Sequence, residues 1–203
     1  MNDFIKIMRL PIMIVVVILT FFVNCYIPTS SMEPTFDVGD RFVTVRSIYC
    51  AIDRRDIINF KYPDDESVCF CKRVIGLPGD IIESKKGVVY INGTIFEEPY
   101  VNETLEDDWT FYIPKKGDVV ECVDGNAYVN GYYVGDAELF SFFYCNDCVV
   151  KEDCYFCMGD NRANSHDSRF WLNHFVKKSS IKSEFKLCYF SKNNIKHLGL
   201  INY

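Results

Sequence analysis

The sequence predicts a mainly β domain that follows a single N-terminal membrane-spanning helix. Leu10–Ile27 is an uncharged apolar stretch, whereas most later apolar stretches are short, alternating and separated by Gly, Pro or Asn. Aromatic residues, which are frequent in strands, make up 16% of the chain. Since few later stretches have helical periodicity, we expect residues 28–203 to fold as one all-β domain with a variable insertion.

The apolar stretch Leu10–Ile27 has the length of a membrane span. Its eighteen residues would form a helix of roughly 27 Å, enough to cross the hydrocarbon core. Lys6 and Arg9 precede it and the next basic residue is Arg41, so residues 1–9 are expected in the cytoplasm and 28–203 on the extracytoplasmic side. A cleaved signal peptide is the alternative, but no small-x-small site follows the stretch. The sequence therefore predicts a single-pass anchor in the cytoplasmic membrane, with the lipid bilayer as a partner.

The remaining strands are predicted from alternation and turn residues. Residues from about 95 to 150 are less regular, and we interpret them as the variable β insertion. The expected strands and hairpins cover Val38–Arg46, Ile57–Tyr62, Ser67–Ile75, 81–91, Asp118–Val123, Ala127–Val134, Tyr155–Met158 and Ile181–Phe190.

The net charge and the cysteine content limit the kinds of partner that we expect. The net charge is −6 and the basic residues are scattered, so nucleic acid is not an expected partner. Ten cysteines are present, and Cys145-x-x-Cys148 with Cys154-x-x-Cys157 resembles a tetrathiolate zinc site. The two pairs are close together for a zinc ribbon, and Cys154 and Cys157 would point to opposite sides of a strand. We favour free thiols and expect no metal or cofactor, with zinc or one disulfide in this region as alternatives.

Hydroxyl side chains gather directly after the apolar stretch, between two prolines, where Ser30 and Ser31 lie in a rigid loop. A serine needs a base to act as a nucleophile. His166 with Asp167 could complete a triad, because triads are defined by geometry and not by sequence order. Lys72 is the other candidate, and burial would have to lower its pKa by roughly three units from about 10.4, at about 4 kcal/mol of desolvation.

Four blocks behind the apolar stretch decide between these bases. They are Pro28-Thr-Ser-Ser-Met-Glu-Pro-Thr35, Gly39-Asp-Arg41, Lys72-Arg-Val-Ile-Gly-Leu-Pro-Gly-Asp80 and Gly159-Asp-Asn-Arg-Ala-Asn-Ser-His-Asp-Ser-Arg169. Their order and spacing resemble those of type I signal peptidases, membrane-anchored serine proteases with a Ser–Lys dyad. The resemblance covers about residues 10–190 and is weakest between 95 and 150.

The resemblance implies a role for each matching residue. Ser31, the serine before Met32, corresponds to the nucleophile and Lys72 to the general base. The Ser31 N–H and the Thr29 hydroxyl correspond to the oxyanion hole, and Ser165 to the serine that orients the lysine by a hydrogen bond. The expected supporting charges are Asp167 with Arg169, and Asp160 with Arg162 in the same segment.

The resemblance also implies the reaction: endoproteolytic removal of N-terminal signal peptides from secretory preproteins, after small-x-small sequences and without metal or cofactor. Two departures from the family pattern are Ala163, where a polar residue is common, and a longer loop over 170–176, as in some Gram-positive members. A related peptidase for one dedicated pilus or conjugation substrate is one alternative. A non-catalytic, membrane-tethered β module that binds metal through its cysteines is the other.

Overall fold

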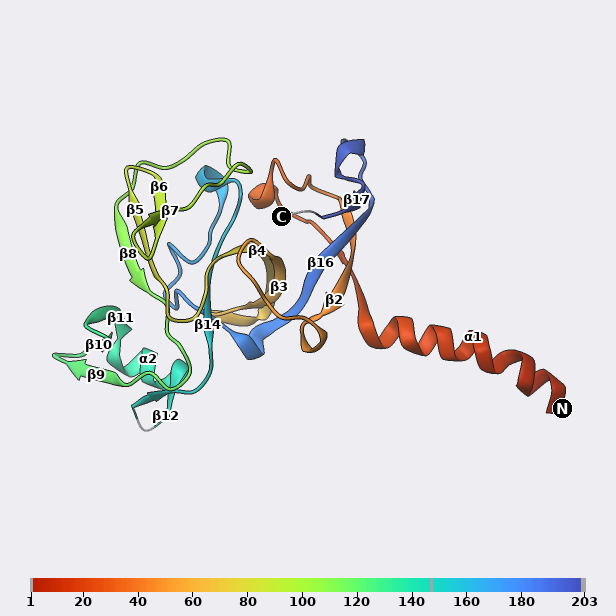
Figure 1. Cartoon of the computed structure of the whole chain (residues 1–203), viewed down its shortest axis with the longest axis horizontal. Coiled ribbons are helices and arrows are strands. Elements are labelled where there is room, and N and C mark those ends of the chain that lie inside the picture. Colours follow the sequence, from red (N-terminus) through yellow and green to blue (C-terminus); the bar gives the residue numbers. More distant parts are fainter. Residues whose placement is uncertain (1, 147, 202–203) are drawn as a thin grey trace.

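The computed structural model describes residues 2–146 and 148–201, and it shows a β-rich body with one projecting helix (Figure 1). Helix α1 (Asn2–Phe21) includes Pro11 and extends away from the body, and its side chains from Arg9 to Phe21 are exposed. Within the described residues, no helix combines the length and the apolar character needed to cross a membrane.

The predicted apolar segment 10–27 is not a single helix. Its last part, Phe22–Tyr26, forms strand β1, which pairs antiparallel with β2 (Arg41–Arg46). Val23 and Cys25 are half-buried while their neighbours are exposed, which is the period-two pattern of a strand at the surface. The segment carries no charge and continues the apolar stretch, so the sequence prediction placed the end of the helix too far along the chain.

One curved antiparallel sheet forms the centre of the body. Its order is β1-β2-β16-β3-β4-β14-β15, with β17 paired to β16. Strand β16 comes late in the sequence but lies between β2 and β3, so it joins the N-terminal strands to the rest of the sheet. The further bounds are β3 (Ile57–Tyr62), β4 (Asp65–Gly76), β14 (Cys154–Met158), β15 (Val176–Lys177), β16 (Ile181–Phe190) and β17 (Gly199–Leu200).

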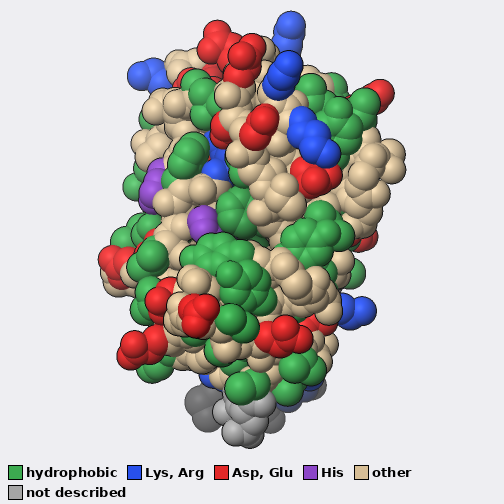
Figure 2. Space-filling model, turned by 90° about the vertical axis from the view of Figure 1, so that its left-hand side faces the viewer, with side chains coloured by type: hydrophobic (Ala, Val, Ile, Leu, Met, Phe, Trp, Pro, Cys, Tyr) green, Lys and Arg blue, Asp and Glu red, His purple; other side chains and the backbone are tan. Residues whose placement is uncertain are grey.

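Two further small sheets and a hairpin lie between residues 81 and 150, so they begin before the predicted insertion of about 95–150. They follow the orders β7-β6-β5-β8, β11-β10-β9 and β12-β13. On the face that these elements form, hydrophobic side chains gather among acidic ones and basic side chains are scattered (Figure 2). The bounds are β5 (Ile81–Lys85), β6 (Val88–Ile91), β7 (Thr94–Ile95), β8 (Trp109–Tyr112), β9 (Val120–Val123), β10 (Asn126–Val129), β11 (Tyr132–Asp136), β12 (Cys145–Asn146) and β13 (Val149–Val150).

Helix α2 (Ala137–Tyr144) was not predicted from the sequence. Asp136 caps it, because its carboxylate accepts hydrogen bonds from the backbone N–H groups of Glu138 and Leu139. Phe140 and Tyr144, one turn apart, are buried in the core. Two helical turns are too short to give a clear periodicity. Short 3₁₀ turns complete the structure: η1 (Ser30–Met32), η2 (Ser47–Tyr49), η3 (Arg162–Asn164), η4 (Lys178–Ser180) and η5 (Ile195–His197).

A buried cluster fixes the hydroxyl-rich loop to the central sheet. Met32 and Phe36 from the loop pack with Phe42 of β2 and Phe185 of β16. The ring centroid of Phe36 lies 4.2 Å from that of Phe42 and 5.6 Å from that of Phe185. The loop therefore has a packed apolar base, which leaves its polar residues in a defined position.

The cysteines are free thiols in the structure. Cys154 and Cys157, on one strand, are buried in two different core clusters, as the alternation of side chains predicts. In the described part of the chain, no three His, Cys, Asp or Glu side chains are grouped as a metal site would need.

Candidate active site

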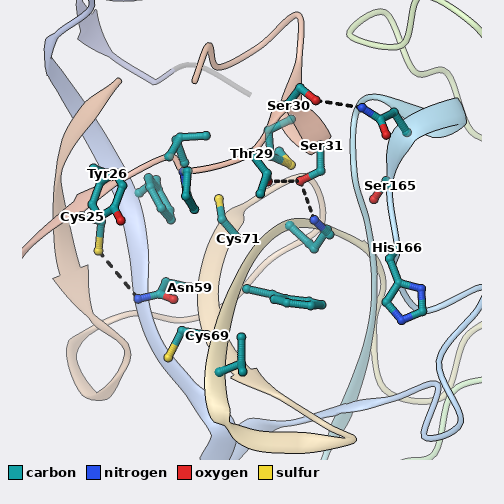
Figure 3. A pocket seen from close by; sticks show the side chains of 18 of the residues that line it. Cys25, Tyr26, Thr29, Ser30, Ser31, Asn59, Cys69, Cys71, Ser165 and His166 are labelled. Carbon is teal, nitrogen blue, oxygen red and sulfur yellow. Dashed lines mark hydrogen bonds between the residues drawn. The ribbon is translucent and has the colours of Figure 1, made fainter. Parts of the chain in front are cut away.

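The two serines of the loop have different environments. Ser31 lies in η1 and is buried, and its backbone oxygen accepts a hydrogen bond from the Asn161 N–H at 3.1 Å. The Ser30 hydroxyl accepts a hydrogen bond from Asn164 Nδ2 at 2.8 Å, drawn as a dashed line from Ser30 in Figure 3. Asn161 Nδ2 also donates to the Ser30 backbone oxygen. The segment after Gly159 thus fixes the loop and engages the Ser30 hydroxyl, whereas the Ser31 hydroxyl is oriented towards Lys72.

Lys72 lies on β4, forty-one positions after Ser31, and its Nζ donates a hydrogen bond to Ser31 Oγ at 2.6 Å. The lysine is only 4% exposed and Ser31 8% exposed. Desolvation by this burial lowers the pKa of Lys72, and the nearby Cys71 and Asp167 oppose the shift only in part. The Phe70 ring centroid is 5.4 Å from Nζ, which adds an apolar wall. The arrangement favours a neutral amine next to a serine hydroxyl.

Thr29 brings a second hydroxyl to Ser31. Its Oγ1 lies 3.3 Å from Ser31 Oγ, and its backbone is extended just before η1. The threonine side chain is therefore on the same side of the loop as the Ser31–Lys72 pair, at the rim of the cavity.

Ser165 lies at the site but does not make the predicted hydrogen bond to Lys72. Its Oγ is buried and has no hydrogen-bond partner among the described residues. The hydroxyl packs against Gly159: a Cβ added to this glycine would lie 2.2 Å from Ser165 Oγ and 2.5 Å from the Ser31 backbone oxygen. The Ser165 side chain therefore lies close to Gly159, and no hydrogen bond joins its hydroxyl to Lys72.

Asp160 links its segment to β4. Its carboxylate accepts hydrogen bonds from Arg73 Nε at 2.8 Å and Arg73 Nη2 at 2.6 Å, and it also accepts one from the Thr35 hydroxyl. Because Arg73 follows Lys72, this buried bidentate pair fixes the strand next to the lysine.

Asp167 and Arg169 form a second buried bidentate pair. Arg169 Nε lies 2.8 Å from Asp167 Oδ1, and Arg169 Nη2 lies 2.9 Å from Oδ2. Asp167 Oδ2 also accepts from the Gly159 N–H, and Arg169 donates to the Arg162 backbone oxygen. Arg162 in turn forms a bidentate ion pair with Glu98. These contacts brace the segment that holds the serine loop.

His166 faces the same cavity but makes other contacts. Its Nε2 lies 3.2 Å from the Tyr62 hydroxyl, and its ring packs edge-on against Tyr62 and Trp171. The Asp167 carboxylate is taken up by Arg169 and Gly159, so His166 does not link it to Ser31 in the described structure.

A cavity of about 860 Å³ opens over the Ser31–Lys72 pair (Figure 3). Its walls come from three parts of the chain: 25–32, 68–72 and 163–166, with Asn59 and Phe185 between them. The sequence analysis gave no role to five residues of the site. Four of them lie inside the quoted motifs: Arg73, Gly159, Asn161 and Asn164. The fifth, Glu98, lies in the insertion, where no sequence signal marks it.

The chain matches the family described as "Signal peptidase, peptidase S26" over residues 1–190. It belongs to this peptidase family. Signal peptidase I of Aquifex aeolicus is 33% identical over 192 residues, with 81% of this chain and 74% of that protein covered. Signal peptidase I P of Bacillus subtilis subsp. natto is 31% identical, with 96% and 92% covered. A crystal structure of a signal peptidase I from Enterococcus faecalis V583 is 28% identical, with a TM-score of 0.43, and the match covers 66% of this chain and 97% of that one.

Family membership makes the chain a serine hydrolase, as the resemblance of its four motifs predicted. Signal peptidases act on secretory preproteins. The mainly β fold is also the one predicted, apart from the shifted N-terminal helix and the additional helix α2.

Proposed function

We propose that the chain cleaves signal peptides from secretory preproteins with a dyad of Ser31 and Lys72. The observation that carries this proposal is the 2.6 Å distance between Lys72 Nζ and Ser31 Oγ in a buried site. A neutral lysine can remove the proton of a serine hydroxyl, and burial lowers the pKa of Lys72 in the required direction. No metal or cofactor is needed for this reaction.

In the proposed reaction, Ser31 Oγ attacks the scissile carbonyl while Lys72 accepts its proton. The Ser31 N–H and the Thr29 hydroxyl stabilise the tetrahedral oxyanion, and such a donor contributes about 2.7–4 kcal/mol when aimed at the developing charge. Lys72 then protonates the leaving amine, and water hydrolyses the ester. The Thr29 hydroxyl, 3.3 Å from the nucleophile, supports its assignment as a donor.

The charged residues around the dyad have a positioning role in this proposal. Asp160 holds the strand of Lys72 through Arg73, and Asp167 holds Gly159 and Arg169. Arg162 extends this brace to Glu98. Ser165 lines the same cavity as Lys72 and its buried hydroxyl has no partner among the described residues, so we propose that it orients Lys72 when substrate binds.

Substrate would bind as an extended strand along β4. Within the described residues, Phe156–Met158 of β14 pair with positions 73–76 of β4. Residues 68–72 of β4 have no partner in β14, and they line the cavity. Adding a strand to such an edge supplies backbone hydrogen bonds. Buried Met32 and Ile27 close the cavity floor beside Ser31, which favours small side chains at the cleavage site.

Helix α1 would hold the enzyme at the cytoplasmic membrane. Its apolar side chains are exposed, and the nucleophile follows its end by only ten residues. We propose that α1 is inserted in the bilayer with residues 1–9 in the cytoplasm and 28–203 on the extracytoplasmic side. Confinement of enzyme and preprotein to one membrane would raise their effective concentration.

Cleavage of a purified preprotein with a small-x-small site tests the proposal. We expect Ser31→Ala and Lys72→Ala to lower the rate about a thousandfold or more, and the double variant to be no worse than either alone. Ser30→Ala and His166→Ala are matched controls that should retain most activity. Undiminished cleavage by Ser31→Ala or Lys72→Ala would refute the dyad, and loss in His166→Ala alone would favour the triad. A panel of unrelated preproteins then separates a general peptidase from a dedicated one.

A further inference from the structure

Hydrogen bonds between its two ends close the serine loop, residues 27–40. The Ile27 N–H donates to the Asp40 backbone oxygen at 3.0 Å, and the Gly39 N–H donates to the Ile27 backbone oxygen at 2.8 Å. The Asp40 side chain is fully buried at this closure, and its Oδ2 accepts a hydrogen bond from the Asp37 N–H at 3.0 Å. Asp40 is therefore the residue at which the ends of the loop meet.

Residues 191–201 return to this closure from the other end of the chain (Figure 1). The imidazole of His197, which is only 9% exposed, has its Nδ1 at 2.8 Å from Asp40 Oδ2. The segment is fixed by its own contacts, since β17 pairs with β16 and the Ile201 N–H donates to the Lys186 backbone oxygen at 2.9 Å. Ile201 also packs against the apolar cluster at the base of the serine loop. His197 thus reaches the loop from a packed segment.

The hydrogen bonds around His197 define which of its nitrogens carries the proton. The Lys196 N–H donates to Asn194 Oδ1 at 3.1 Å, so the amide nitrogen of Asn194 faces His197 Nε2, at 2.9 Å. An amide nitrogen can only donate, so Nε2 accepts and the neutral imidazole has its proton on Nδ1. That proton is donated to Asp40 Oδ2. Both nitrogens of the imidazole therefore have a partner, and one of these partners closes the serine loop.

The Asp40 carboxylate depends on this contact. Among the described residues, its Oδ1 has no hydrogen-bond partner, and its Oδ2 accepts from His197 and from the Asp37 N–H. Without the imidazole, the buried carboxylate would retain one hydrogen bond, which is costly for a charged group away from water. Water would then have to reach the carboxylate, and the closure between Ile27 and Asp40 would have to open to admit it.

We propose that His197 is a positioning residue that holds Ser31 in place by keeping the serine loop closed, an inference that rests on the proposed dyad. The hydrogen bond from His197 fixes Asp40 at the closure, and the closed loop keeps Ser31 Oγ at 2.6 Å from Lys72 Nζ. Asp40 belongs to the Gly39-Asp-Arg41 motif, whereas the family match ends at residue 190, before His197. The support from His197 is thus additional to the matched motifs.

Preprotein cleavage by the full chain with His197→Ala or His197→Asn tests the proposal. The amide nitrogen of asparagine is bonded to Cγ, as Nδ1 of histidine is, so His197→Asn keeps a donor for Asp40. Because His197 does not line the cavity, we expect kcat of His197→Ala to fall about tenfold with KM within about twofold, and His197→Asn to recover most of the loss. Lys196→Ala, exposed in the same 3₁₀ turn, is the matched control and should keep both constants.

Three outcomes of these kinetics would overturn the proposal. They are an unchanged kcat in His197→Ala, an equal fall in His197→Asn, and an equal fall in Lys196→Ala. His197→Leu is the second variant without a donor, and it fills more of the space of the imidazole. It should lower kcat as His197→Ala does, so the proposal stays testable even if the alanine variant does not fold.

Hydrogen exchange of the backbone amides separates this inference from the proposed function, because it needs no activity. Measured by mass spectrometry on the full chain, amides in residues 27–40 should exchange at least about tenfold faster in His197→Leu than in the wild type, and those of β3 and β4 at the same rate. Equal exchange in 27–40, or faster exchange throughout the body, would refute a local closure by His197. If the wild-type chain cleaves no preprotein, the dyad proposal fails, while the exchange rates still report on the closure.

Discussion

Burial of Lys72 has two opposite consequences. It lowers the pKa of the lysine, which prepares a neutral amine beside Ser31, but it also penalises the folded state. A group whose pKa is lower in the folded chain than in the unfolded one destabilises the fold as the pH falls below its unfolded value. Burial of Lys72 therefore favours its role as a base but lowers the stability of the fold.

Replacing Lys72 by methionine should separate the effect of this residue on cleavage from its effect on stability. Lys72→Met keeps the length and apolar volume and removes the buried ionisable group, so we expect no cleavage and a higher melting temperature. Each kcal/mol gained raises the melting temperature by about 2–4 °C in a chain of this size. Lys182→Met, at an exposed position on β16, is the control and should change little. A lower melting temperature for Lys72→Met would contradict the desolvation argument.

The pH dependence of cleavage reports on the same residue. Because the neutral lysine is the base, kcat/KM should rise with pH through the pKa of Lys72 and reach half its maximum well below the ordinary lysine value of about 10.4. The profile of His166→Ala should coincide with that of the wild type. A midpoint near 10.4, or one that disappears in His166→Ala, would show that the buried lysine is not the titrating base.

At the scale of elements, the segment 159–169 positions the serine loop. It holds Ser31 through Asn161, and its own shape depends on the buried pair of Asp167 and Arg169. Gly159 is the point of closest approach, where the backbone of the segment meets both Ser31 and Ser165. Its φ angle is not in the left-handed region, so a side chain is excluded here by space alone.

Gly159→Ala tests this contact. The added Cβ would lie 2.5 Å from the Ser31 backbone oxygen, so the loop must move and we expect kcat to fall about 10²-fold. Ser165→Ala as a second change removes the clash with the hydroxyl but leaves those with the Ser31 backbone oxygen and, at 2.6 Å, with the Cβ of residue 165, so it should not restore the rate. Cleavage kinetics and thermal unfolding are the measurements, with Ser165→Ala alone as the control. Wild-type kcat in Gly159→Ala would show that this packing does not position the nucleophile.

At the scale of the whole molecule, the body and helix α1 are nearly independent. The body is held by the sheet that β16 joins together and by three buried clusters. The described contacts of α1 with the body lie near the end of the helix, where the Phe21 ring lies 4.4 Å from that of Tyr49 and the Leu19 backbone oxygen accepts a hydrogen bond from Arg46. The packed contacts that stabilise the fold thus lie in the body, and the exposed apolar side chains of α1 are available to contact a membrane.

Removal of residues 1–21 should therefore leave the melting temperature within a few degrees of the full chain, since few packed contacts are lost. Flotation with lipid vesicles should show binding of the full chain and not of the shortened one. The shortened chain should still cleave a soluble peptide but act more slowly on a preprotein held in vesicles. Equal vesicle binding by both forms would contradict the proposed anchor.

Elements with a local sequence pattern could be predicted before the structure. Strands Ile57–Tyr62 and Ile181–Phe190 have the predicted bounds, because each is a short stretch rich in β-branched and aromatic residues that ends at a turn. Strand β1 and helix α2 were missed: β1 continues an uncharged, mostly apolar stretch, and α2 depends on a cap and two buried rings. The motifs also identified the loop and the lysine as the candidate site.

The way in which these elements come together is visible in the three-dimensional structure alone. The antiparallel order β2-β16-β3-β4 and the apolar base of the loop bring Lys72 to Ser31, and the amide of Asn164 engages the hydroxyl of Ser30 instead. The pairing of Arg162 with Glu98 across the insertion carries no sequence pattern at all. Such contacts depend on the packing of distant segments, which hydrophobic periodicity does not encode.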